Sequence, residues 1–158
     1  MLIASLALWA ASTALAASPE PAAASLHVDD GQTTFAATVT PDDQAGYRIA
    51  INCAGQCRAP TSYSETVGDT PLGLFSRDQD DLILSLWSGG SAYRVRVWSI
   101  ADGEVGKIAD LSSRGRPEFL NAPDGGTMIR TFEAESGVAA LHEVNWTSSA
   151  GRFVRSGD

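Results

Sequence analysis

The side chains with the clearest capacity for chemistry lie on one predicted strand near the middle of the chain. The sequence YRVRVW alternates, so Arg94, Arg96 and Trp98 share one face of an extended strand, opposite the tyrosine and valines. Guanidinium groups beside an indole suit carboxylates, sulfates or sugar rings. We therefore identify Arg94, Arg96 and Trp98 as a candidate ligand-binding strip. The alternative is that the guanidinium groups stack on the ring or pair with acidic side chains of an adjacent strand.

A second group of chemically active side chains precedes a predicted strand. Asp78, Asp80 and Asp81 place three carboxylates in one turn, and hard cations such as calcium bind turns of this kind. The segment lacks the glycine and the distal glutamate of an EF-hand loop. The simpler interpretation is a solvated turn in which Asp78 hydrogen-bonds the local backbone. These aspartates are secondary candidates for a metal site, and the sequence predicts no cofactor.

The two cysteines, Cys53 and Cys57, lie close together in the segment INCAGQC. Their spacing is one residue longer than the C-x-x-C pattern of redox centres. The two histidines, His27 and His142, are too distant in sequence to complete a zinc site at the usual ligand spacing. In an oxidising compartment such a cysteine pair forms a small disulfide loop. We predict a structural disulfide between Cys53 and Cys57.

No sequence motif points to an enzyme. The chain has no Gly-x-Ser-x-Gly nucleophile elbow, and it contains only two histidines and two cysteines. A glycosidase would need two placed carboxylates, which a sequence does not place. The prediction is a non-enzymatic protein, with a small hydrolase of unrecognised site as the last alternative.

Composition limits the partners. The chain has 158 residues, with 19 acidic against 11 basic residues and a formal net charge of −8. Binding to a nucleic acid or to an anionic membrane needs a concentrated positive surface, which this acidic composition does not favour. The length fits a single domain.

The N-terminal residues predict export. Residues 2–11 are almost wholly apolar, and Ala14-Leu15-Ala16 has the small-x-small pattern of a cleavage site, although residues 1–17 contain no Lys or Arg. The apolar run is too short to cross about 30 Å of hydrocarbon, so we predict no membrane span in the mature chain. We predict a signal peptide over 1–16, a flexible Pro/Ala spacer over 17–24 and one all-β domain over 25–158. The protein would be periplasmic or extracellular.

The elements that would position the candidate residues are all strands. Residues 82–87 and 93–98 are β-rich runs, and Ser88-Gly89-Gly90-Ser91 between them has the composition of a hairpin turn. Similar runs occur on both sides, and no helical periodicity of useful length follows the signal segment. The sequence therefore predicts an antiparallel all-β fold.

The strand pattern also repeats. A shift of 46 residues places Pro71 on Pro117, and after two inserted residues Trp98 falls on Trp146. A weaker match relates residues 47–49 to residues 93–95. We predict three four-stranded units at about 25–66, 71–111 and 117–155.

Residues 74–78, 82–85, 95–100 and 102–104 together resemble one blade of a WD-repeat or related β-propeller, and residues 119–154 are similar to a second, more degenerate blade. The resemblance covers about residues 71–155. It departs from the family at Trp98-Ser99, where the family has Trp-Asp, and in lacking the Gly-His pair. Propellers close with 4–8 blades, so three blades imply open sheet edges. A β-trefoil, a β-prism and a β-sandwich are the alternative architectures.

These features predict an exported, non-enzymatic module that binds a protein or glycan partner through its strand faces and loops. The alternative is a structural or assembly protein whose open sheet edges pair with a partner, or with a second copy as a homo-oligomer, to complete a propeller. Nucleic acid is not an expected partner.

Overall fold

The computed structural model describes residues 24–29, 31–44, 46–135, 140–149 and 151–156. The predicted signal peptide and nearly all of the predicted spacer lie outside these ranges. Within them, every regular element is a strand except for two short 3-10 turns, η1 (Asp78–Asp80) and η2 (Ala101–Gly103). None of the described segments is a helix of the length and apolarity needed to span a membrane. The all-β prediction is confirmed.

The strands form three four-stranded antiparallel sheets in chain order, which confirms the three predicted units. Sheet A contains β1 (Ala24–Asp29), β2 (Thr33–Asp42), β3 (Gly46–Gly55) and β4 (Ser62–Val67). Sheet B contains β5 (Thr70–Arg77), β6 (Leu82–Ser88), β7 (Tyr93–Ser99) and β8 (Gly106–Ser113). Sheet C contains β9 (Glu118–Asn121), β10 (Thr127–Ala134), β11 (Leu141–Ser149) and β12 (Arg152–Arg155). Each sheet is a meander, so hairpin connections set every register.

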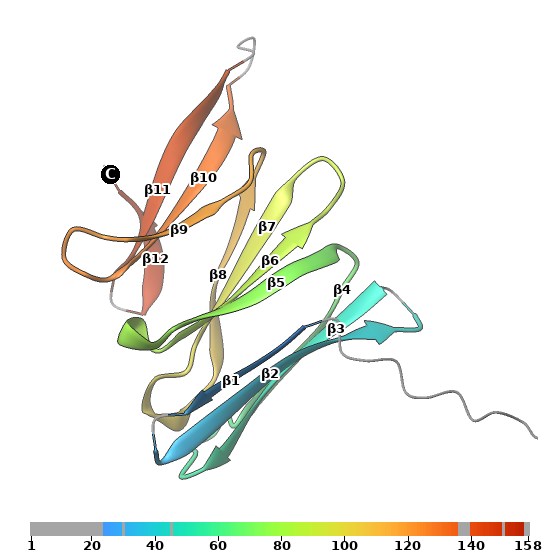
Figure 1. Cartoon of the computed structure of the whole chain (residues 1–158), viewed down its shortest axis with the longest axis vertical. Coiled ribbons are helices and arrows are strands. Elements are labelled where there is room, and N and C mark those ends of the chain that lie inside the picture. Colours follow the sequence, from blue (N-terminus) through green and yellow to red (C-terminus); the bar gives the residue numbers. More distant parts are fainter. Residues whose placement is uncertain (1–23, 30, 45, 136–139, 150, 157–158) are drawn as a thin grey trace, which may run out of the picture.

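Sheet B lies between sheets A and C, and the three are stacked like the blades of a fan (Figure 1). This arrangement explains why β6 reads LILSLW without the usual alternation of apolar and polar residues. Alternate side chains of β6 enter two different cores, one on each face of sheet B, and both faces are buried. A strand covered on both faces needs apolar residues at nearly every position.

The core between sheets A and B is built from aliphatic side chains of sheet A and tryptophans of sheet B. Phe35, Ile49 and Ile51 of sheet A belong to one buried cluster with Trp87 and Trp98. Each fully buried side chain of this size contributes about 1.5–3 kcal/mol relative to exposure. The tryptophans therefore fix how sheet A sits on sheet B.

The core between sheets B and C is mainly apolar. Leu84, Leu86 and Val97 of sheet B pack in one cluster with Ile129 and Phe153 of sheet C. The first strands of the sheets also gather along one side of the molecule: β1 contacts β5, and Phe75 of β5 packs on Phe119 of β9 with ring centroids 5.0 Å apart. This placing of first strands together resembles the inner edge of propeller blades.

Candidate functional site

The three side chains of the predicted binding strip lie on β7 and face sheet A. Trp98 is fully buried, and its ring meets that of Tyr63 on β4 edge to face, with centroids 5.7 Å apart. Arg94 is half exposed and places its Nε 3.4 Å from Oδ2 of Asp69. The strand alternation therefore correctly predicted that the three side chains share one face of β7. Sheet A covers most of that face.

Arg96 lies between the two sheets, with its side chain only 12% exposed. Its Nε is 3.2 Å from Oε1 of Glu65 on β4 and 3.3 Å from Oδ2 of Asp110 on β8. Its guanidinium carbon also lies 5.6 Å from the ring centroid of Trp87. Arg96 thus pairs with acidic neighbours and stacks on an indole, as in the alternative interpretation of the strip.

Glu65 is the shared acceptor of this cluster. Lys107 Nζ donates to its Oε2 at 2.8 Å, and the Tyr63 hydroxyl donates to the same oxygen at 2.6 Å. Burial raises the pKa of Glu65, but the hydrogen bonds from Lys107 and Tyr63 and the charges of Lys107 and Arg96 outweigh it, so the net pKa lies below the usual value. The carboxylate stays ionised and connects sheet A to sheet B.

The pKa values of Lys107 and Tyr63, the two hydrogen-bond donors to Glu65, are shifted upward. Burial lowers the pKa of Lys107, but its hydrogen bond and ion pair with Glu65 outweigh burial and raise that pKa overall. Burial and the Glu65 carboxylate together raise the pKa of the Tyr63 hydroxyl. At neutral pH the cluster therefore holds a charged Lys107 and a neutral tyrosine, and both donate to Glu65. Nε and Nη1 of Arg96 are buried without a hydrogen-bond acceptor among the described residues, so Arg96 is held by its ion pairs. These contacts join sheet A to sheet B and stabilise the packing of the two sheets.

The second predicted group lies at η1. Asp78 and Asp80 belong to this turn, and Asp81 follows it directly. The described residues include no group of three or more side chains that could hold a metal ion. Gln79 within η1 donates to the carbonyl of Gly125 at 3.5 Å, so the turn rests against the β9–β10 connection. Asp81 has a left-handed backbone with φ of 51° and lines a pocket instead.

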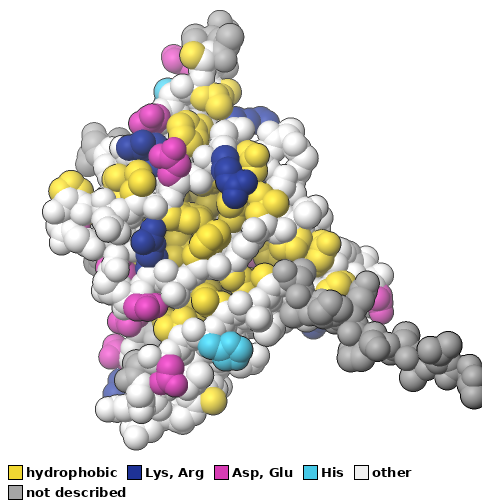
Figure 2. Space-filling model, viewed as in Figure 1, with side chains coloured by type: hydrophobic (Ala, Val, Ile, Leu, Met, Phe, Trp, Pro, Cys, Tyr) yellow, Lys and Arg dark blue, Asp and Glu magenta, His cyan; other side chains and the backbone are white. Residues whose placement is uncertain are grey.

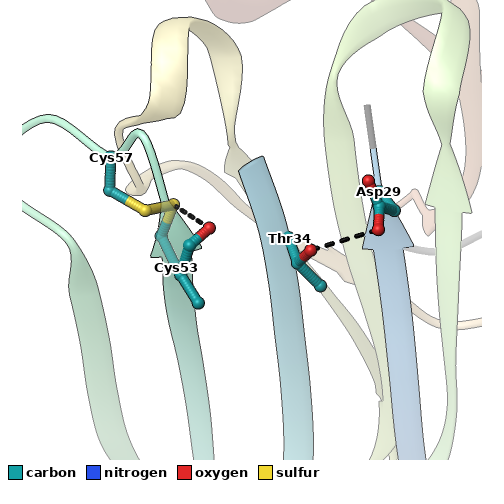
Figure 3. Close-up of a disulfide and its surroundings, with 5 residues drawn as sticks. Asp29, Thr34, Cys53 and Cys57 are labelled. Atoms are coloured by element: carbon teal, nitrogen blue, oxygen red, sulfur yellow. Dashed lines mark hydrogen bonds between the residues drawn. A yellow bond between two sulfur atoms is a disulfide. The ribbon is translucent and has the colours of Figure 1, made fainter. Parts of the chain in front are cut away.

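The predicted disulfide is present: the Sγ atoms of Cys53 and Cys57 are bonded at 2.04 Å. It closes the loop at the end of β3, beside β2 and β1, where Thr34 donates to Asp29 (Figure 3). The backbone amide of Cys53 donates to the carbonyl of Thr61 at 2.8 Å. The disulfide therefore fixes the segment that carries Gln56 and Arg58.

This segment forms one wall of a polar pocket at the ends of sheets A and B, with a volume of about 410 Å³. We call it the loop pocket. It is lined by Gln32, Thr33, Gln56, Arg58, Asp81, Ile100, Asp102 and Gly103. Four separate segments supply these residues, and only Asp81 had been identified from the sequence.

Backbone hydrogen bonds hold the four segments of the loop pocket together. The amide of Gln56 donates to the carbonyl of Gln32 at 3.1 Å, and the amide of Arg58 donates to the carbonyl of Gly103 at 3.0 Å. The amide of Ile100 donates to the carbonyl of Asp81 at 2.8 Å. Gly103 is needed at this junction, because its φ is 76° and a Cβ there would lie 3.1 Å from the carbonyl oxygen of Gln56.

Three charged side chains of the loop pocket are exposed: Arg58, Asp81 and Asp102. None of the three uses its side chain in a hydrogen bond or ion pair with another described residue. Asp102 resembles Asp81 in having a left-handed backbone, with φ of 57°. Exposed charged groups in a pocket whose loops are held in place by backbone hydrogen bonds can bind a polar ligand noncovalently.

A second surface with binding capacity is apolar. Leu72 and Phe75 on β5 are 39% and 37% exposed, and the ring of Phe75 packs against that of Phe119 at an interplanar angle of 57°. Leu72 lies at a bulge, because the β5–β6 register shifts between Pro71 and Gly73. Figure 2 shows hydrophobic side chains gathered across the middle of the face that it draws, in the region where Figure 1 places β1, β5 and β9. We call the surface formed by Leu72, Phe75 and Phe119 the apolar edge.

The two surfaces thus differ in chemistry and position. The loop pocket offers charges and amides at the ends of sheets A and B, whereas the apolar edge offers side chains of first strands. Comparison of the chain with protein-family models, with curated proteins and with solved structures found no match, so its own geometry carries the functional argument.

Proposed function

We propose that the protein is an exported, non-enzymatic module that binds a protein partner through the apolar edge. The observation that supports this proposal most directly is the exposure of Leu72 and Phe75 on the edge strand β5, where Phe75 also packs against Phe119 of β9. Contiguous apolar side chains on a surface favour contact with another macromolecule because their removal from water is favourable. The disulfide supports export, because such bonds persist in oxidising compartments.

The strand edges favour docking of side chains over addition of a strand. β1, β5 and β9 are the first strands of their sheets and have one unpaired edge each. The bulge at Pro71 and Gly73 interrupts the regular ladder of β5. Bulges at edges discourage the pairing of further strands, so the partner would contact the rings and the leucine instead.

The test compares one double variant with one single variant, after a partner has been captured from the extracytoplasmic fraction and purified. Leu72→Ser with Phe75→Ser removes the exposed apolar groups and should weaken binding to the purified partner at least tenfold. Leu141→Ser is the matched control, because Leu141 is 45% exposed on β11 of sheet C. Circular dichroism and unfolding midpoints would establish that both variants fold. Unchanged affinity of the double variant would contradict the proposal.

A second copy of the chain is the other candidate partner. The three sheets of each copy would then be the blades of one closed propeller. The supporting observation is that each sheet is a meander and that sheets A and C flank sheet B, which leaves their outer faces uncovered by a described strand. Sedimentation equilibrium would decide this candidate. A single monomeric species at the highest soluble concentration would exclude self-assembly and leave the apolar edge for another protein.

A further inference from the structure

We propose that the loop pocket is a second, separate binding site, and that its ligand is a neutral saccharide. This inference does not depend on the apolar edge, which lies on the first strands of the sheets.

The size and the polarity of the loop pocket suit a sugar. A volume of about 410 Å³ lies within the range of about 300–1,000 Å³ found for small-molecule sites. The one large apolar side chain in its lining, Ile100, is buried, so apolar ligands gain little there. A saccharide presents hydroxyl groups that both donate and accept hydrogen bonds. Carboxylates accept, a guanidinium donates and carboxamides do both, which matches this ligand.

The charges of Arg58, Asp81 and Asp102 favour a neutral ligand. Two carboxylates stand against one guanidinium, so phosphate, sulfate and uronic acids would meet a net negative site. A metal ion is disfavoured as well, because the described residues contain no group of three ligating side chains. Neutral hydroxyl groups can use the donor and both acceptors without an electrostatic penalty.

The loop pocket is also organised before any ligand binds. Backbone hydrogen bonds join the Gln32, Gln56, Asp81 and Gly103 segments, and the Cys53–Cys57 disulfide closes the Gln56 segment. Groups that are already in place lose little conformational entropy on binding. The loops themselves then need no ordering, and only the exposed side chains lose freedom when a sugar binds.

The backbones of Asp81 and Asp102 give an independent indication. Both are left-handed, with φ of 51° and 57°, a conformation that glycine adopts more readily than any other residue. Aspartate is one of the few other residues that adopt this conformation, and Asp81 caps the end of η1. No side-chain contact within the described residues engages either carboxylate. Non-glycine residues in such conformations cluster at functional sites. Both carboxylates are exposed and available to a ligand.

The experiment is saturation-transfer NMR with titration calorimetry, using a panel of neutral hexoses, N-acetylhexosamines and their short oligomers at millimolar concentration. Asp81→Gly and Asp102→Gly each remove a carboxylate while keeping a residue that fits the left-handed backbone. We expect at least one saccharide to bind, and each variant to weaken that binding at least tenfold without a lower unfolding midpoint. Asp43→Gly is the matched control, because Asp43 is an exposed aspartate in the turn after β2.

Three results would overturn the proposal: no binding by any saccharide of the panel, unchanged binding by both pocket variants, or an equal loss in Asp43→Gly. The Leu72→Ser, Phe75→Ser variant should keep its full saccharide affinity. Loss of sugar binding in that variant would place the sugar at the apolar edge instead, and would also contradict the proposed site.

Discussion

Arg96 on β7 and Glu65 on β4 meet across the interface of sheets A and B, with 3.2 Å between Nε and Oε1. The contact lies beside the apolar core, since Arg96 also stacks on Trp87 and Tyr63 contacts Trp98. The interface therefore combines an apolar centre with a connected group of charges. Such a group stabilises only while every member keeps its partner.

Glu65→Gln should destabilise the fold by about 1–3 kcal/mol. The substitution removes the negative charge that Lys107 and Arg96 share, and leaves Arg96, only 12% exposed, with Asp110 as its remaining carboxylate. Partial exposure of Lys107 and Asp110 keeps the cost below that of a fully buried pair. Urea unfolding measures the change in the free energy of unfolding.

Glu118→Gln is the matched control for this substitution. Glu118 pairs with Arg130 at 3.1 Å on sheet C, but its side chain is 48% exposed. Exposed pairs contribute about 0–1 kcal/mol, so this variant should lie close to the wild type. Equal losses in the two variants would contradict a special role for the Glu65 cluster.

The same cluster predicts how stability depends on pH. The pKa of Glu65 is lowered from its ordinary value of 4.5, so its stabilising effect is present above that value and is lost as the pH falls through the lowered pKa. The pKa of Lys107 is raised from 10.5, so its effect is present below that value and is lost as the pH rises through the raised pKa. Unfolding free energies of wild type and Glu65→Gln should therefore differ most between these limits and converge in acid. A constant difference down to strongly acid pH would contradict this assignment.

Periodicity alone was sufficient for the fold class and for the shared face of Arg94, Arg96 and Trp98. Strand alternation is a local property, and the cysteine spacing that predicted the disulfide is local as well. The residues that cover the Arg96 face are distant in the sequence. Glu65 lies on another sheet, and no pattern around residue 96 specifies that sheet A packs there. The sequence could therefore identify the side chains but not their partners.

The loop pocket shows the same limit more strongly. The sequence indicates Asp81 as a metal candidate, whereas no pattern around Gln32, Arg58 or Asp102 predicts a binding role for those residues. Asp102-Gly103 is a turn signal in the sequence, which predicts a change of direction but not a convergence with the disulfide loop. A pocket assembled from four segments of two sheets depends on how those sheets pack, and that information is spread over all the residues of the core between sheets A and B.

Removal of the disulfide should destabilise the protein by about 2 kcal/mol through the added freedom of the unfolded chain. The variant is Cys53→Ser with Cys57→Ser, and the wild type in reducing agent should unfold at the same midpoint as the variant. Because this loop carries Gln56 and Arg58, saccharide affinity at the loop pocket should fall as well. An unchanged unfolding midpoint after reduction would contradict a stabilising role.

The two core tryptophans give the sharpest comparison, because both are fully buried but only one uses its ring nitrogen. Trp87 Nε1 donates to Ser85 Oγ at 2.6 Å, whereas Trp98 Nε1 is buried without an acceptor among the described residues. Phenylalanine removes the N–H in both cases and costs similar apolar area. Trp87→Phe also leaves the Ser85 hydroxyl without its donor in the core, while Trp98→Phe removes an unsatisfied donor. Trp87→Phe should therefore cost about 1 kcal/mol more than Trp98→Phe in urea unfolding.

Trp98→Ala separates packing from hydrogen bonding at the same position. It removes the whole ring that meets Tyr63 edge to face, and such a change in a closed core costs about 3–5 kcal/mol. Phe75→Ala is its control, because Phe75 is 37% exposed and its truncation opens no closed cavity. A Trp98→Ala variant with near wild-type stability would mean that sheet A does not cover this face in solution. The Arg94, Arg96 and Trp98 strip would then be open to ligand, so this one measurement decides between the two interpretations of the strip.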